Sequence, residues 1–151
     1  MGFEQALAGK DAAELTPLVT PDVHFEDPLT DPLTGPDALV AHVSRLWTAF
    51  PDARVERTGP LMRDGRHVAD PVKLVATHRG ELEGLPASGR FVVVHAVLVC
   101  ELSEDEQRLW RVRAFYDAYG AGVQLGVLPE RGSMGGKALL MLRGFGLRAR
   151  N

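Results

Sequence analysis

Two aspartates in the sequence stand where a carboxylate could act as an acid or a base. Asp117 lies in the run Phe115–Tyr119, and Asp27 directly precedes a proline. An aspartate buried in an apolar cavity is poorly solvated, so its pKa rises and it becomes a better base for a carbon acid. We expect Asp117 to lie in such a pocket and to be the principal candidate. A salt bridge to Arg113 or Arg111 on the same predicted strand is the competing interpretation.

Two histidines are further candidates for a polar contact with a bound molecule. His78 lies in the segment Thr-His-Arg-Gly-Glu, where it could orient a substrate oxygen or pair with a carboxylate. His95 lies in a run of valines, so it is either a core histidine or the polar group of a sheet that lines a pocket. The strand face that carries Phe91, Val93, His95 and Val97 is directed either at that pocket or at a partner subunit.

Several aromatic side chains and one arginine could line a substrate pocket, although core packing explains the same aromatic residues. These candidates are Trp47, Arg113, Phe115, Tyr116 and Tyr119. The five histidines show no closely spaced pair of metal ligands, and the sequence lacks a phosphate-binding glycine loop and a Gly-x-Ser-x-Gly motif. We therefore expect no metal and no cofactor.

The elements that must position these residues are helices followed by strands. A helix is expected from the Gly-Pro pair at 35–36 to residue 50, because apolar residues recur there at helical spacing. Two shorter helical segments are expected at 3–8 and 12–15. Strands are expected at 23–27, 54–62, 68–82, 90–102 and 109–119, with a hairpin turn at 63–65 and loops at 28–35 and 84–89. This order predicts an α+β fold, with helices on one face of a curved antiparallel sheet.

The composition is that of one folded domain. The chain has 151 residues, of which 45% are hydrophobic and 25% are charged, enough to bury a core without disulfides. A net charge of −3 argues against nucleic-acid binding through a basic surface. The lone cysteine, Cys100, lies in an apolar run and is expected to be a buried thiol. We see no signal peptide or spanning segment and expect a cytoplasmic protein that binds no membrane.

Residues 127–151 form a C-terminal extension that is expected to be partly helical. The stretch from Lys137 to Leu147 mixes apolar and basic residues, a pattern found in helices that bind membrane surfaces. Gly144 and Gly146 weaken an isolated helix, however. We therefore expect this strip to dock on its own domain or on a partner subunit.

Five short motifs follow one another along the chain. They are Pro-Asp-Val-x-Phe-x-Asp-Pro at 21–28, Ala-Phe-Pro-Asp at 49–52, Thr-His-x-Gly-Glu at 77–81, Gly-x-Pro-x-x-Gly-Arg at 84–90, and a closing segment from Asp117 to Gly126. Each motif is weak alone, but together they resemble the SnoaL-like polyketide cyclase family of the nuclear transport factor 2-like superfamily. The resemblance covers most of residues 6–126 and leaves the tail after Pro129 unmatched.

The resemblance implies a fold and a range of functions. It implies a single SnoaL-like domain over residues 1–151, a cone-shaped barrel in which a curved sheet wraps around helices and leaves an apolar cavity. It also implies a small apolar molecule as ligand and a homodimer packed through the sheet. The superfamily contains cyclases, isomerases, epoxide hydrolases and binding modules, so the fold does not fix the chemistry.

For the site residues the resemblance implies specific roles. Asp117 matches the general acid/base of cyclases that close a ring by an intramolecular aldol reaction, and His78 matches a histidine that often faces the cavity. Asp27 lies in a segment similar to the one that carries the base of ketosteroid isomerases. The tyrosine that those isomerases carry on the first long helix is missing, and the third strand offers His95 in place of their protonated aspartate.

The sequence therefore predicts a cyclase or isomerase that acts on a carbonyl-bearing, polyketide-like apolar molecule. Asp117 would be the general acid/base, and Asp27, His78 or His95 would position or polarise the substrate. The alternatives are a non-catalytic module of the same fold that binds a small ligand or a partner, or an enzyme like the ketosteroid isomerases or epoxide hydrolases.

Overall fold

A computed structural model of the chain describes residue 6, residue 10, residues 14–139 and residue 141. The helical segments expected at 3–8 and 12–15 fall mainly outside these residues, as does the tail beyond 141. In the described part, a short 3-10 turn leads into strands and helices in the order β1 (Val19–Asp27), β2 (Thr30–Thr34), α2 (Pro36–Ala49), β3 (Arg54–Arg57), β4 (Met62–Asp64), β5 (His67–Thr77), β6 (Phe91–Leu102), β7 (Leu109–Tyr116) and α3 (Ala118–Leu125).

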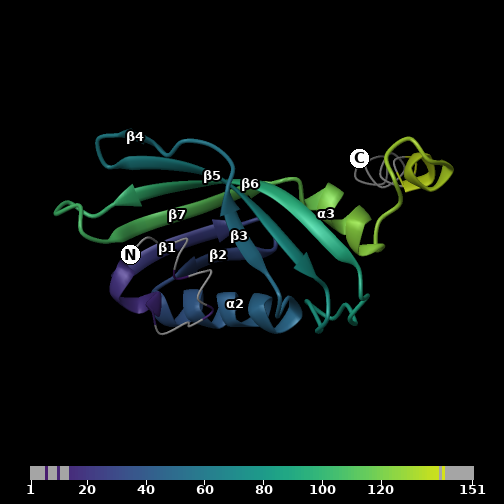
Figure 1. The fold of residues 1–151 in the computed structure, drawn as a ribbon, viewed down its shortest axis with the longest axis horizontal. Helices are drawn as coiled ribbons and strands as arrows, with labels where there is room; N and C mark the ends of the chain where they lie inside the picture. The colour runs from purple at the N-terminus through teal and green to yellow at the C-terminus, as the bar shows by residue number, and fades with distance from the viewer. Residues whose placement is uncertain (1–5, 7–9, 11–13, 140, 142–151) are drawn as a thin grey trace, which may run out of the picture.

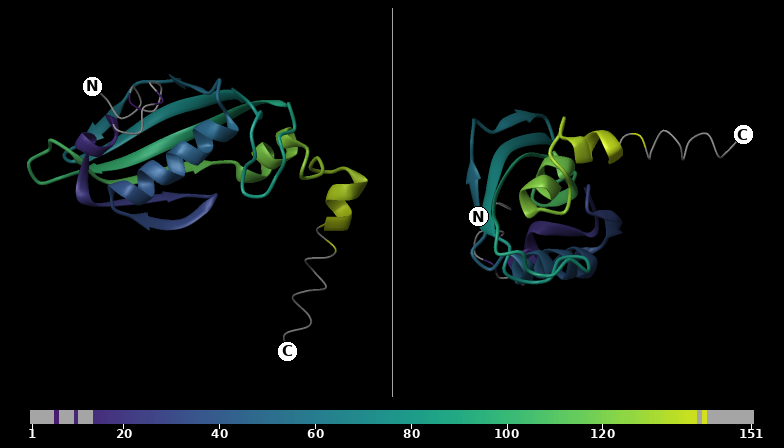
Figure 2. Two further views of the ribbon diagram at one scale, coloured as in Figure 1. Left: turned by 90° about the horizontal axis from the view of Figure 1, so that it is seen from below. Right: turned by 90° about the vertical axis from the view of Figure 1, so that its right-hand side faces the viewer.

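The strands form one curved sheet that wraps around the helices, which confirms the expected α+β cone (Figure 1). The strand order is β2-β1-β7-β6-β5-β3, with β4 paired to β5. The sheet is open and mixed rather than wholly antiparallel, because β1 and β7 run parallel. Figure 2 shows that α2 and α3 both lie on the concave side of the sheet, so neither of them covers its convex face.

Helix α2 forms where its sequence pattern predicts. Gly35 adopts a positive φ of 89° before the first turn, and Pro36 occupies a position where a missing backbone N–H costs nothing. The buried side chains of the helix lie on one face and include Leu39, His42 and Val43. That face packs against the inner side of the sheet and fixes the position of α2 over the cavity.

The strand boundaries differ from expectation at several places, and β1 begins at Val19 rather than at residue 23. The expected loop at 28–35 contains β2, which pairs with β1 through a register of Phe25 with Leu33. The expected strand at 54–62 is interrupted after Arg57, because Pro60 has no N–H to donate to a ladder. Strand β5 ends at Thr77 rather than continuing to 82.

The last expected strand also ends early and is followed by helix α3, which the sequence pattern did not indicate. The Asp117 side chain caps this helix by accepting a hydrogen bond of 2.9 Å from the Gly120 N–H. Gln124 then bonds to both backbone groups of Val93, at 2.7 and 2.9 Å, as a neighbouring strand would. These contacts anchor α3 beside β6 and complete the far wall of the cavity.

The core lies between α2 and the concave face of the sheet. Its buried members include Leu15, Val23, Leu39 and Val112, each essentially inaccessible to solvent. Cys100 is buried as predicted, and this burial raises the pKa of its thiol to about 12. Within the described ranges, no helix is long and apolar enough to cross a membrane.

The C-terminal end of α2 is held by a tight backbone contact. The N–H groups of Arg79 and Gly80 both donate to the carbonyl of Ala49, at 2.9 and 3.0 Å. At Gly80 the backbones approach so closely that a Cβ atom would collide with the carbonyl oxygen of Thr48. Only glycine fits there without displacing the end of the helix.

We expect Gly80→Ala to lower the free energy of unfolding by about 3 kcal/mol, because the added methyl group meets fixed backbone. Gly65→Ala is the matched control: Gly65 has a φ of 55°, but its Cβ would meet nothing within 4 Å. It should cost about 1 kcal/mol from backbone strain alone. Urea denaturation of both variants measures the difference, and equal losses would contradict the close contact at Gly80.

Candidate functional site

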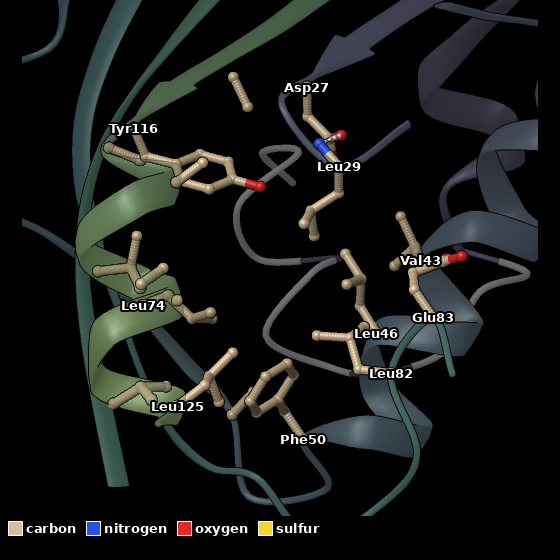
Figure 3. Close-up of a pocket in the computed structure, with 18 of the residues that line it drawn as sticks. Asp27, Leu29, Val43, Leu46, Phe50, Leu74, Leu82, Glu83, Tyr116 and Leu125 are labelled. Atoms are coloured by element: carbon tan, nitrogen blue, oxygen red, sulfur yellow. Dashed lines mark hydrogen bonds between the residues drawn. The ribbon is translucent and has the colours of Figure 1, made fainter. Parts of the chain in front are cut away.

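A cavity of about 520 Å³ lies between α2, α3 and the concave face of the sheet. Strands β5, β6 and β7 each contribute alternate side chains to it, and residues 82–85 border it (Figure 3). Nearly all of the lining is aliphatic or aromatic, and the volume suits a ligand of drug size. The polar exceptions are concentrated at a few positions, of which Asp27 and Tyr116 lie at the same end (Figure 3).

Asp27 lies at the end of β1, where the chain turns into β2. Its Oδ1 accepts hydrogen bonds from the N–H groups of Leu29, at 2.8 Å, and Thr30, at 3.1 Å. Its Oδ2 lies 2.8 Å from Nε2 of His42 on α2. The side chain is only 4% exposed. The carboxylate is therefore held in one orientation by the β1–β2 turn and by the helix.

The hydrogen bonds of His42 fix its protonation pattern. Nε2 faces the Asp27 carboxylate, whereas Nδ1 is buried without a partner among the described residues. A neutral imidazole with its proton on Nε2 satisfies the carboxylate and leaves only an acceptor unpaired. A proton on Nδ1 would instead leave a buried N–H donor without an acceptor. With its proton on Nε2, His42 donates a hydrogen bond to the Asp27 carboxylate.

Tyr116, the last residue of β7, directs its hydroxyl group into the same end of the cavity (Figure 3). No hydrogen bond joins that hydroxyl to the rest of the described chain, so it is free to contact a bound molecule. Burial raises the pKa of the phenol well above its ordinary value, and the negative charge of Asp27 raises it further. Tyr116 is thus a hydrogen-bond donor throughout the neutral pH range.

We expect Asp27→Asn to lower the pKa of Tyr116 while leaving it above the ordinary value, since the charge is removed but burial persists. The chain has two tyrosines, so the Tyr119→Phe background leaves tyrosinate absorbance that reports on Tyr116 alone. An alkaline titration with and without Asp27→Asn measures the change. Identical titration curves would contradict the electrostatic contact between the two groups.

The expected position of Asp117 in the pocket is wrong. Its side chain is 57% exposed and forms an ion pair with Arg131 at 3.0 Å, and the same carboxylate caps α3. Neither Arg113 nor Arg111 is its partner: Arg111 pairs with Glu26. Asp117 lies outside the cavity because β7 ends at Tyr116 and α3 begins at Ala118, where the sequence pattern indicated a continuing strand.

The two candidate histidines lie outside the cavity. His78 is fully buried, and its Nδ1 accepts from the N–H of Ser88 at 3.1 Å, which holds the 78–90 loop together. His95 is exposed on the convex face of the sheet, with Phe91 and Val97. The β6 face that carries His95 is therefore the convex one, because the alternate residues of β6 line the cavity. The sequence had left the direction of this face open.

The aromatic candidates divide in the same way. Trp47 and Tyr116 line the cavity. Phe115 is 53% exposed on the convex face, where the Arg113 guanidinium lies 5.7 Å from its ring centroid. The Tyr119 hydroxyl donates to the carbonyl of Pro129 at 2.7 Å, so it fastens the segment after α3. Phe115, Arg113 and Tyr119 are therefore wrong as substrate contacts of this cavity.

His42 is a site residue that the sequence analysis missed. It lies in the amphipathic pattern of α2, where a single histidine is indistinguishable from a core residue. A signal was present in the register: position 42 follows Leu39 by one helical turn, so it faces the same side as the apolar core residues. A polar ring on that side requires a partner, which in the structure is Asp27.

The family model for the SnoaL-like polyketide cyclases matches residues 2–125. The chain belongs to this family. The match ends at the last residue of α3, so the C-terminal extension lies outside it. A comparison with curated proteins finds no match.

Solved structures share the fold of this family member at low sequence identity. A protein assigned as a SnoaL-like polyketide cyclase from Jannaschia sp. is 20% identical, with a TM-score of 0.73 over 83% of this chain and 86% of the other. AclR of Streptomyces galilaeus, assigned as a hydroxylase, is 22% identical, with a TM-score of 0.71 over 84% and 81%. IdmH of Streptomyces antibioticus, assigned as a polyketide cyclase, is 21% identical, with a TM-score of 0.67 over 83% and 94%.

Proposed function

We propose that this protein is a cyclase or isomerase that uses acid/base chemistry on a carbonyl-bearing apolar molecule, with Asp27 as the base. The observation that carries the proposal is the pair of polar groups at one end of an otherwise apolar cavity. The Asp27 carboxylate is oriented by His42, and the Tyr116 hydroxyl has no hydrogen-bond partner among the residues that the structure describes. Family membership supports the class of reaction, and the burial of the Asp27 carboxylate at the cavity supports it as the base in place of the exposed Asp117.

The proposed reaction begins with a proton transfer. Asp27 takes a proton from the carbon beside the substrate carbonyl, the electron pair of that C–H bond forms a carbon–carbon double bond, and the π pair of the carbonyl moves onto its oxygen to give the enolate. The Tyr116 hydroxyl donates a hydrogen bond to the enolate oxygen as its negative charge develops. His42 keeps the carboxylate in place throughout and is a positioning residue.

The second step of the reaction depends on which group reacts with the enolate. If the enolate carbon attacks a second carbonyl of the same molecule, a carbon–carbon bond forms, and the new alkoxide recovers the proton from Asp27. If the substrate carries a neighbouring carbon–carbon double bond, the enolate is a dienolate, and return of the proton to its far carbon gives an isomer. Both outcomes regenerate the carboxylate, and the apolar walls strengthen each electrostatic contact by excluding water.

The proton-transfer step can be tested without the natural substrate. The neutral probe 5-nitrobenzisoxazole is apolar and aromatic, and removal of its ring proton by a base opens the ring to a coloured phenolate. We expect the protein to accelerate this reaction, and Asp27→Asn to reduce the rate by at least about 100-fold. Tyr116→Phe should reduce it by about tenfold or less, since the developing phenolate loses one donor.

Asp117→Asn is the matched control for this experiment. The substitution is the same, and asparagine still caps a helix, but the residue is solvent-exposed and paired with Arg131. It should leave the rate unchanged. A rate that fell in Asp117→Asn and persisted in Asp27→Asn would overturn the assignment and restore the residue that the sequence favoured.

A non-catalytic ligand-binding module is the second candidate function. The observation that favours it is that three donors already hold Asp27, as in a structural Asx turn. Binding of the apolar probe without any acceleration by the protein would support this alternative.

We propose in addition that two copies of the chain pack through the convex face of the sheet. This face carries exposed Phe91, Val97 and Phe115, and Val97 lies directly opposite Phe115 in the β6–β7 register. No helix of the described part covers it (Figure 2). Exposed aromatic residues gathered on one face of a sheet are typical of a protein interface.

We expect Phe115→Glu to convert the dimer to a monomer, because a carboxylate would be buried opposite the apolar face of the second copy. Met134→Glu is the control, since Met134 is 88% exposed in the segment after α3, away from the sheet. Sedimentation velocity measures the outcome. A wild-type monomer, or a dimer that survives Phe115→Glu, would refute this packing.

A further inference from the structure

The charged groups of the cavity all have the same sign. Within the part of the chain that the structure describes, its lining contains two carboxylates, Asp27 and Glu83, and no lysine, arginine or histidine. Every other lining side chain is uncharged, and nearly all are apolar. A molecule in the cavity therefore experiences a negative potential that nothing in the wall cancels, in a region of low dielectric constant.

The backbone fixes Glu83 at the border of the cavity. Leu82 and Leu85 exchange two backbone hydrogen bonds, of 3.0 and 2.8 Å, across a two-residue turn. Glu83 and Gly84 form that turn with φ angles of 48° and 82°, both in the left-handed region. Leu82 and Leu85 insert into the cavity, and Glu83 lies beside them at its edge (Figure 3).

Two nearby arginines compensate this potential only weakly. Arg45 lies 3.9 Å from Glu83, but both side chains are more than half exposed, so water and salt screen their attraction. Arg90 packs its guanidinium against Gly126 and is not part of the lining. The Asp27 carboxylate is buried, where water and salt screen its charge less, and its described partners are hydrogen-bond donors of Leu29, Thr30 and His42 rather than a lysine or an arginine.

The proposed chemistry favours a neutral substrate for the same reason. When Asp27 takes a proton from a neutral molecule, one negative charge moves from the carboxylate to the enolate and the total charge of the cavity stays constant. An anionic substrate would bring a second negative charge into the same apolar space before and after the transfer. Its burial would be opposed by desolvation and by repulsion from Asp27.

We infer that the cavity selects its ligand by charge: it accepts neutral and cationic molecules with an apolar ring system and excludes carboxylates and other anions. Asp27 causes the exclusion in the interior, and Glu83 adds to it at the edge. The inference rests on the proposed function in taking this cavity as the substrate site. It names the charge class of the substrate and does not depend on which reaction follows.

Three probes with the same ring system separate charge from apolarity. They are 1-naphthylmethanol, which is neutral, 1-naphthylmethylamine, which is a cation at neutral pH, and 1-naphthoate, which is an anion. Each is titrated against the protein loaded with the neutral fluorophore N-phenyl-1-naphthylamine, whose displacement gives the affinity. Desolvation weakens the binding of both charged probes, whereas repulsion by the two carboxylates weakens the binding of the anion alone. The ratio of cation to anion affinity is therefore the quantity that reports on them.

We expect the cation to bind at least about tenfold more tightly than the anion in wild-type protein. Glu83→Gln should reduce this ratio by about two- to threefold at low salt, and the effect should vanish at high salt because Glu83 is exposed. Arg45→Gln should change the ratio in the opposite direction, since it removes the cation beside Glu83. Asp27→Asn should reduce the ratio most, and this part should persist at high salt because the carboxylate is buried.

Equal affinities for the cation and the anion would overturn the inference, as would a ratio unchanged by both Glu83→Gln and Asp27→Asn. Glu83→Gln alters an exposed turn residue, so it keeps the test decisive even if Asp27→Asn does not fold. The outcome is independent of catalysis. A selective cavity with no acceleration of 5-nitrobenzisoxazole would refute the proposed function only, and acceleration without selectivity would refute this inference only.

Discussion

The hydrogen bond between Asp27 and His42 is the interaction on which the organisation of the cavity depends. It joins the end of β1 to the middle of α2 and is buried on both sides. In the turn after β1, two backbone N–H groups donate to Oδ1 of Asp27, which leaves Oδ2 directed at His42. One bond therefore aligns the helix with the sheet and orients the one buried carboxylate that the described lining contains. The two side chains that hold the helix on the sheet are therefore also the proposed base and its positioning residue.

Much of the fold follows from patterns that are local in the sequence. The Gly-Pro start and the apolar spacing predicted α2. Phe115 and Tyr116 were both expected to line the pocket, but only Tyr116 does, since neighbouring residues of a strand point to opposite faces and Phe115 is exposed. The site was less predictable because it depends on where elements end. Asp117 was misplaced because α3 contains Gly120 and Gly122, which are poor helix formers. Its cap and its pairing with Arg131 are tertiary contacts that no local pattern reveals.

The cavity combines an extensive apolar surface with very few polar groups, and this contrast decides how it can act. The aliphatic walls bind by excluding water and are tolerant of shape. The Asp27 carboxylate and the Tyr116 hydroxyl lie at one end and give the cavity a direction. In the proposed reaction a substrate engages both, through an acidic C–H bond and a hydrogen-bond acceptor. Residues 82–85 and α3 close the space from opposite sides, so the length of the cavity is set by segments that lie outside the main sheet ladder.

The parallel pairing of β1 with β7 has a consequence for how the chain folds. The first strand of the sheet lies between β2 and the last strand, so residues 19–27 find their central neighbour about ninety positions later, at residues 109–116. During synthesis, β1 can pair only with β2 until β7 has been made, and a two-stranded hairpin is marginally stable in water. The sheet closes only after β7 has emerged. The cavity is thus a late product of folding, and a nascent chain that stops before β7 has no place to hold a ligand.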